Sequence, residues 1–429
     1  MKITKSDIKI FLRKIQEKGF FHLLSANILI QIFAFASQLF VAGILSPEDI
    51  GRIKIIQTYL SVFSVIAGMG LNASTLKICS EGREHKENIG YFNAALIFSI
   101  ISSTIVYFIV LIINYFKLLS SDALINFLIP FGLFPLITNT IFVLFTVYFQ
   151  ATKEIKLFSN LTVFNKLFSI ICIILFVYFW SIEGYYIAYN LSFILIIFVS
   201  AKNLKKKIKF TVNFDYKKMF KTHWKYANSS LISNIIAELS AYTDIILIGL
   251  LVNDMHEIGM YSFALTITVL LRLFPSTVQQ ITIPYFSSFD KGKNEFILIF
   301  KRYNLILYIV VSLSLLALLI LAPFLLNLIF KGKYDGSYIY LIFLSLGWSI
   351  RNLNQLKTGA IFGLGKIHYN AYIGLITLVV NLVIYPILLN YYGIIGAAYA
   401  SMLSGIAFFI SSSCFYNRAI KETVWKYDD

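Results

Sequence analysis

A lysine-rich stretch, residues 201–225, interrupts an otherwise apolar chain and divides it into halves of nearly equal length. It contains nine lysines and one acid. Each half consists of about six apolar segments, and short motifs recur between the halves at offsets of 206 to 213 residues. The matched motifs are 43–45 with 249–251, 50–51 with 258–259, 149–153 with 362–366, and Gly184 with Gly393. This pattern indicates a tandem duplication joined by a basic linker, a layout typical of membrane transporters built from two parallel repeats.

The chain is too apolar for a water-soluble fold of its length. Of its 429 residues, 58% are hydrophobic and 14% charged, and its mean hydropathy is +0.77. We therefore expect an all-α integral membrane protein whose apolar segments each cross about 30 Å of hydrocarbon as a helix. The expected spans are 20–45, 53–77, 91–116, 123–149, 157–180, 184–200, 227–251, 259–286, 303–330, 338–362, 369–390 and 394–417.

The basic residues predict the orientation of these twelve spans. With a cytoplasmic N-terminus, 29 of the 37 Lys and Arg lie on the cytoplasmic side and five on the other, so both termini are expected inside. The net charge of +16 then reflects topology and contact with anionic lipids rather than nucleic-acid binding. The expected parts are a cytoplasmic amphipathic segment (1–19), a first lobe (20–200), a basic cytoplasmic linker (201–226), a second lobe (227–417) and a cytoplasmic tail (418–429).

The first span of each half carries a polar stripe. Asn27, Gln31 and Gln38 fall on one face of the first helix, and Asn234 and Glu238 lie 207 residues beyond the first two of them. Buried amides of this kind can join helices, at roughly 0.6–2 kcal/mol each. Because the stripe recurs at the repeat offset, we expect both stripes to face a shared central cavity.

The second and eighth spans continue this polar pattern. The second has Gln57, Ser61, Ser64, Gly68 and Asn72 on one flank, and the eighth has Thr268, Arg272, Ser276 and Gln279 at helical spacing. A charge near mid-membrane costs about 3 kcal/mol, so Arg272 should face protein or water rather than lipid. The sequence leaves two compatible roles open for Arg272: a functional contact, or a salt bridge to Glu238 or Asp244.

Two further basic residues lie inside expected spans. Arg351 belongs to an unusually polar run, 351–355, and is expected to line the cavity. Lys166 lies close to the cytoplasmic end of its span, where reaching back to the headgroups is as good an explanation as function.

Catalytic and cofactor chemistry is not indicated by the sequence. The three cysteines and five histidines are scattered without metal-ligand spacing, and no phosphate-binding glycine loop or nucleophile motif occurs. The expected loops on the outer side reach about ten residues, which leaves no room for an extracytoplasmic domain. We therefore expect no cofactor and no enzyme activity, with a membrane-embedded polysaccharide-synthesis enzyme as the less favoured alternative.

Several short motifs resemble one family of transporters, the bacterial oligosaccharide-lipid flippases (O-antigen or Wzx type) of the multidrug/oligosaccharidyl-lipid/polysaccharide exporter superfamily. The resemblance extends over nearly the whole chain, and the ordered set of motifs carries it. These motifs are 45–51, 68–72, 244–249, 258–261 and 392–398. The turn at 274–276 also resembles the lipid II flippase branch, whose two additional helices are not expected here.

The resemblance implies two six-helix lobes around a central cavity that opens alternately to each side of the bacterial cytoplasmic membrane. It implies an undecaprenyl-diphosphate-linked glycan as cargo, membrane lipids as neighbours, and contacts with other polysaccharide-assembly proteins such as a polymerase or chain-length regulator. An Arg fork suits the diphosphate of such a cargo. The alternative within the superfamily is a drug/cation antiporter, which often has an acid in its first helix, where this chain has Asn27, Gln31 and Gln38.

Overall fold

The computed structural model of the chain describes residues 20–81, 83–205, 215–287, 289 and 292–425, and this part is helical, without strands. The side chains of residues 20–30 are not part of this description. The amphipathic segment expected over 1–19 and the middle of the basic linker therefore lie outside the described residues, as does the side chain of Asn27.

Twelve segments, matching the twelve expected spans, can be traced through the described helices, and nine helices or helix pairs among them are long and apolar enough to cross a membrane. Six are single helices: α2 (Phe20–Ile44), α5 (His85–Tyr115), α9 (Tyr216–Leu251), α12 (Lys293–Phe330), α15 (Ile367–Tyr392) and α16 (Ile394–Glu422). Helix α8 (Ile155–Lys205) supplies two crossings around a kink at Trp180 and Ser181. Four crossings are pairs of shorter helices: α3 (Pro47–Gly68) with α4 (Leu71–Cys79), α6 (Ala123–Leu133) with α7 (Pro135–Ala151), α10 (Met255–Thr268) with α11 (Leu270–Ser287), and α13 (Ser337–Leu353) with α14 (Gln355–Gly363).

The break between α3 and α4 depends on a glycine. Met69 and Gly70 both have left-handed backbone conformations, with φ of 48° and 67°. A Cβ added at Gly70 would lie 2.3 Å from the carbonyl oxygen of Ala227 on α9. Glycine thus allows both the break in the helix and the close approach of α9.

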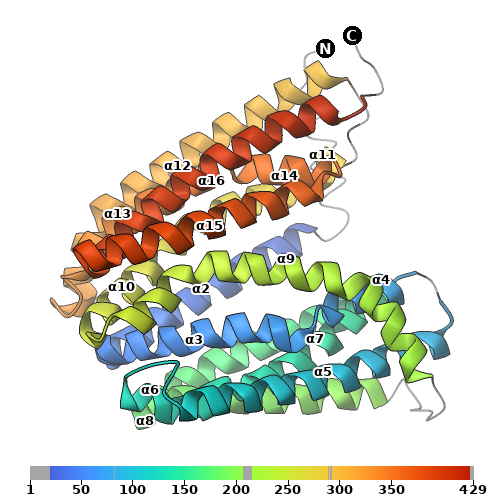
Figure 1. Cartoon of the computed structure of the whole chain (residues 1–429), viewed down its shortest axis with the longest axis horizontal. Helices are drawn as coiled ribbons and strands as arrows, with labels where there is room; N and C mark the ends of the chain where they lie inside the picture. Colours follow the sequence, from blue (N-terminus) through green and yellow to red (C-terminus); the bar gives the residue numbers. More distant parts are fainter. Residues whose placement is uncertain (1–19, 82, 206–214, 288, 290–291, 426–429) are drawn as a thin grey trace.

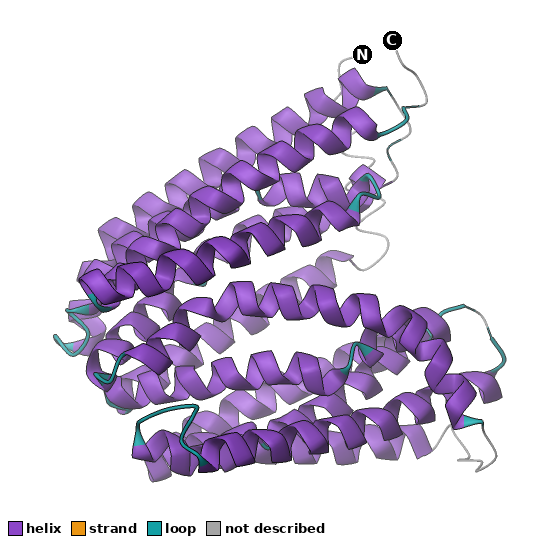
Figure 2. Ribbon diagram, in the orientation of Figure 1, coloured by secondary structure: helices purple, strands orange, loops and turns teal. Residues whose placement is uncertain are grey.

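The helices form two groups that meet at one end of the molecule and diverge toward the end where α2 begins and α16 ends (Figure 1). The first group contains α2–α8 and the second α10–α16, and both are built entirely of helices over the described residues (Figure 2). Placement of the termini at one end agrees with an even number of crossings.

Helix α9 contacts both groups, although the sequence analysis assigned it to the second lobe. On one side it packs on α3, α4 and α5, and on the other on α15. The buried ring of His223 bonds to Ser74 Oγ of α4 at 2.8 Å and to the Tyr91 carbonyl oxygen of α5 at 3.0 Å. Farther along, Asn381 of α15 donates to the carbonyl oxygen of Ser240 at 3.1 Å. The two groups are thus joined along α9 as well as through the linker.

At the closed end of the molecule, α3 packs directly on α10 through positions that correspond in the two repeats. Gly51 and Gly259 are 208 residues apart in sequence and lie against each other. A Cβ on Gly259 would lie 1.8 Å from the Pro47 carbonyl oxygen, so the contact is between backbones. Glu48 and His256, also 208 residues apart, form a hydrogen bond of 2.9 Å between the carboxylate Oε1 and the imidazole Nδ1.

A second contact at this end joins the loop between α12 and α13 to the last turn of α2. The Lys333 ammonium donates to the carbonyl oxygens of Ala42 (2.9 Å), Gly43 (3.1 Å) and Leu45. The buried Tyr334 hydroxyl donates to the Ala42 carbonyl oxygen at 3.0 Å. These oxygens have no partner within a helix that ends here, so a lysine stabilises the helix terminus.

Candidate functional site

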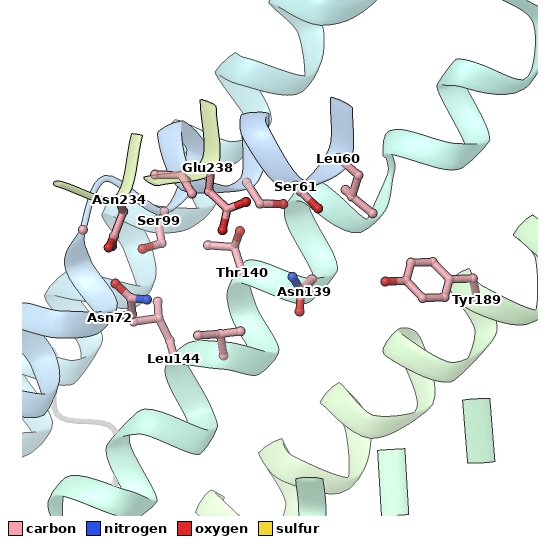
Figure 3. A pocket seen from close by; sticks show the side chains of 15 residues that line it. Leu60, Ser61, Asn72, Ser99, Asn139, Thr140, Leu144, Tyr189, Asn234 and Glu238 are labelled. Atoms are coloured by element: carbon pink, nitrogen blue, oxygen red, sulfur yellow. The ribbon is translucent and has the colours of Figure 1, made fainter. Parts of the chain in front are cut away.

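A cavity of about 300 Å³ lies within the first helix group beside α9. Side chains from α3, α4, α5, α7, α8 and α9 surround it. Its lining residues are Leu60, Ser61, Ser64, Val65, Gly68, Gly70, Asn72, Ser99, Asn139, Thr140, Val143, Leu144, Tyr189, Asn234 and Glu238. We call it the N-lobe cavity. Figure 3 shows Asn72, Ser99, Thr140, Asn234 and Glu238 gathered around one space, with the Tyr189 ring on its far side.

The polar flank predicted for the second span lines this cavity. Ser61, Ser64 and Gly68 share one face of α3, because they are spaced by three and four residues. Asn72 follows the break at Gly70 and continues the lining on α4. The polar stripe therefore continues along the same cavity, although the helix is broken at Gly70.

The hydrogen-bonding groups of the cavity are only partly used within the protein. Ser64 Oγ and Ser99 Oγ are buried and have no hydrogen-bond partner in the described structure. Ser99 is 0% exposed, and the partly exposed side chain of Asn139, which lines the same cavity, makes no hydrogen bond to the described residues. Buried polar groups are normally paired, so these atoms are available to water or a ligand.

Glu238 is the one charged residue among the described residues of the lining. It lies on α9 one turn after Asn234, whose amide donates to Ser230 Oγ at 3.3 Å. Asn234 and Glu238 are the two residues of the seventh span whose sequence pattern predicted a cavity. The cavity is thus a polar space with a single carboxylate.

Two arginines contact one indole ring at the junction of α11 and α13. The guanidinium carbon of Arg272 lies 5.2 Å from the centre of the Trp348 ring, and that of Arg351 lies 5.5 Å from it. Arg351 also lies 4.6 Å from the centre of the Phe408 ring on α16. Such contacts between a cation and an aromatic ring contribute about 0.5–2 kcal/mol each. We call Arg272, Trp348 and Arg351 the arginine cluster.

Neither arginine of the cluster forms an ion pair with a carboxylate in the described part of the chain. Glu238 and Arg272 are close enough to attract each other electrostatically, and Arg351 and Arg272 to repel each other. The salt bridge considered for Arg272 with Glu238 or Asp244 is therefore not formed in this conformation. Arg272 is exposed and Arg351 is partly buried.

Asp244 is held by other groups. Its carboxylate accepts a hydrogen bond from the buried Tyr261 hydroxyl at 3.0 Å and from the backbone N–H of Ile245 at 2.8 Å. Lys54 of α3 interacts with it electrostatically. Asp244 and Arg351 both line a second, small cavity of about 30 Å³ between α9, α13, α15 and α16.

The remaining predicted site residues lie apart from both cavities. Gln279 joins α11 to α14: its amide donates to the Gln355 carbonyl oxygen and to Thr358 Oγ1, and its oxygen accepts from the Gln355 amide. Lys166 is exposed on α8. Gln31 and Gln38 are exposed on α2 and do not line either cavity. Among the described side chains of the two predicted stripes, those of Asn234 and Glu238 line a cavity in this conformation.

Several site residues were not predicted from the sequence. Ser99, Asn139 and Thr140 are single polar residues or pairs in strongly apolar spans, and they come together only through packing of α5 and α7 on α3 and α4. Trp348 lies three residues before Arg351, on the same face of α13. That spacing could have indicated their contact.

A model of the family described as "Polysaccharide biosynthesis protein" matches residues 17–290. The chain is also 24% identical over 418 residues to the capsular polysaccharide biosynthesis protein CapF of Staphylococcus aureus, covering 94% of this chain and 99% of CapF.

Two solved structures show the fold. The lipid II flippase MurJ in an inward closed conformation superposes with a TM-score of 0.76 at 16% identity, covering 94% of this chain and 89% of MurJ. An inward-facing multidrug resistance MATE family transporter of the MOP superfamily gives a TM-score of 0.70 at 13% identity, covering 92% and 96%. The expected all-helical, two-lobed membrane fold is confirmed.

Proposed function

We propose that this chain, which belongs to the polysaccharide biosynthesis protein family, flips undecaprenyl-diphosphate-linked oligosaccharide repeat units across the bacterial cytoplasmic membrane. The exported units would serve assembly of O-antigen, capsule or another surface polysaccharide. Membership of the family and the fold shared with a lipid II flippase support a carrier of lipid-linked glycans. These relatives also favour transport over catalysis.

The arginine cluster is the observation that carries this proposal. Two guanidinium groups share one indole, repel each other, and have no carboxylate ion pair in the described structure. A diphosphate would bring the negative charge that separates and satisfies them. Arg suits this role because its planar fork can bind two phosphate oxygens at once.

Glu238 supplies a carboxylate that can compete with the cargo diphosphate for Arg272. Because its carboxylate attracts Arg272 without forming an ion pair in this conformation, we propose that it holds the arginine in another conformation of the cycle and releases it to the diphosphate. Asp244 keeps its bond to Tyr261 and balances the charge of Lys54, so in our proposal it fixes α9. The cargo would enter from the end where the helix groups diverge and leave after the α3–α10 contact opens. The lipid tail would stay in the bilayer.

The orientation and partners follow from the same proposal. The end with both termini and the basic linker would face the cytoplasm, as the distribution of lysines predicts. The cargo lipid, membrane lipids and the proteins that polymerise the exported glycan would be the partners. No nucleic acid is involved.

The rival function is drug or cation antiport, because a MATE transporter has the same fold. One observation favours it: the N-lobe cavity has a carboxylate, Glu238, and no basic lining residue among those described. Two arginines near that cavity count against a cationic cargo, because they would repel it.

Replacement of Arg272 tests the proposal. In a strain that lacks this protein, Arg272→Ala should abolish surface polysaccharide and Arg272→Lys should leave weak export, since Lys keeps the charge and loses the fork. Arg302→Ala, at an exposed arginine on α12, is the matched control and should export normally. Membrane abundance is measured for every variant. Full export by the double variant Arg272→Ala with Glu238→Gln would show that the arginine is only a counter-ion and would overturn the role proposed here.

A further inference from the structure

The N-lobe cavity does not suit the diphosphate that the arginine cluster would bind. Its described lining contains hydroxyl and amide groups, one carboxylate and no basic side chain. A second anion beside Glu238 would be repelled. The cavity therefore calls for a neutral, polar ligand, or for a cation.

Its polar atoms are arranged for hydrogen bonding to such a ligand. Ser64 Oγ and the fully buried Ser99 Oγ have no partner in the described structure. The partly exposed Asn139 amide lines the same cavity and makes no hydrogen bond to the described residues. Figure 3 shows Ser99, Asn139 and Glu238 on different helices around the same space. A hydroxyl-rich ligand would satisfy these donors and acceptors together.

Size and shape favour a sugar over an ion. The cavity volume of about 300 Å³ is at the lower end of the roughly 300–1,000 Å³ typical of small-molecule pockets. Within the described residues no group of three His, Cys, Asp or Glu could hold a metal ion. Tyr189 is partly exposed at the cavity wall, where an aromatic ring can cover the apolar face of a sugar.

The cavity and the arginine cluster adjoin the same turn of α9. Glu238 lines the N-lobe cavity, and Ser240 and Ala241, two and three residues later, line the small second cavity together with Trp348 and Arg351. A sugar in the cavity would thus lie next to a diphosphate on the arginines, in the order in which the two groups are linked in a glycan lipid.

We propose that the N-lobe cavity is a separate binding subsite for the sugar residue nearest the diphosphate, with Asn139, Ser99 and Glu238 as its hydrogen-bonding groups. This inference rests on the proposed function, because the lipid diphosphate brings the sugar to the cavity. It assigns recognition of the glycan to the first helix group and recognition of charge to the second.

The experiment compares two probes on the full chain in lipid nanodiscs: undecaprenyl diphosphate, and the same lipid bearing one N-acetylhexosamine. The unchanged protein should bind the sugar-bearing lipid more tightly. Asn139→Leu keeps the side-chain size and removes the amide, and it should reduce that preference roughly five- to tenfold without changing affinity for the bare lipid. Glu238→Gln keeps two hydrogen-bonding atoms and should retain most of the preference for the sugar-bearing lipid. Asn390→Leu, at an exposed position on α15, is the matched control and should leave both affinities unchanged.

The outcomes separate the two proposals. Arg272→Ala should weaken binding of both lipids equally. Equal affinity of the unchanged protein for the two lipids, or an unaltered preference in Asn139→Leu, overturns the sugar subsite and leaves the flippase proposal standing. If neither lipid binds to the unchanged protein, the proposed function fails, and the subsite with it. If Asn139→Leu changes sodium- or proton-dependent transport and leaves the sugar preference intact, the cavity is a cation site and the inference is wrong.

Discussion

Glu48 and His256 stand at corresponding positions of the two repeats, 208 residues apart, and their side chains meet at 2.9 Å where α3 crosses α10. Gly51 and Gly259, three residues farther along each helix, pack against each other in the same contact. This contact closes the molecule at the end away from the chain termini (Figure 1). In the proposed cycle it must open for cargo to leave.

Gly259→Val should keep this end from closing. The added Cβ would meet the Pro47 carbonyl oxygen at 1.8 Å, so α3 and α10 must separate. Overpacking of this kind costs about 1–3 kcal/mol, which would shift the closed-to-open ratio roughly five- to a hundredfold. The distance between spin labels on α3 and α10 measures the change. Gly43→Val is the control, since no atom lies within 4 Å of the Cβ there. An unchanged distance in Gly259→Val would contradict the close packing described here.

His256→Glu should have a smaller effect of the same sign. It places two carboxylates opposite each other, but the pair is partly exposed, so we expect a change of about 1 kcal/mol or less. The double variant Glu48→His with His256→Glu restores opposite charges and should recover the original label distance. If the double variant behaves like the single one, the ion pair does not stabilise the contact.

Lys333→Ala should loosen the last turn of α2. The ammonium donates to three carbonyl oxygens there, and a cation at a helix C-terminus contributes about 0.3–2 kcal/mol. Backbone hydrogen exchange at residues 42–46 should therefore increase up to about thirtyfold. Lys331→Ala, in the same loop and exposed, should leave it unchanged. Equal exchange in both variants would show that the lysine contact is not maintained.

Topology can be checked with single cysteines in a background that lacks Cys79, Cys172 and Cys414. A cysteine at the exposed Asp335, in the loop between α12 and α13, should react with a membrane-impermeant reagent added to intact cells. A cysteine at Lys206 in the basic linker should be protected. Reversed reactivity would place the termini and the arginine entry path on the outer side.

The spans, the duplication and the polar stripe of α3 could be predicted because they depend on local composition and helical spacing. The break at Phe134 could also have been predicted, because Pro135 follows it. The break at Asn354 could not, because the Asn354 amide donates to the Phe409 carbonyl oxygen on α16, a contact made only by tertiary packing. The same applies to Lys333. From the sequence, Lys333 is expected only as a loop residue that fixes topology, whereas its partners lie about 290 residues away on α2. Gln31 and Gln38 have the spacing of a cavity-facing stripe, yet tertiary packing places them outside both cavities.

At the closed end, corresponding positions of the two repeats contact each other. This is the arrangement of an isologous interface, in which each surface meets a copy of itself. A half-length ancestor that dimerised this way would have placed one glycine against its own symmetry mate, as Gly51 and Gly259 lie now. It would also have placed identical side chains opposite each other at position 48. Only after the two halves shared one chain could that position become Glu in one and His in the other. Fusion of the halves would thus have allowed a self-complementary contact to become one between an acid and an imidazole, which no symmetric homodimer can form at its axis.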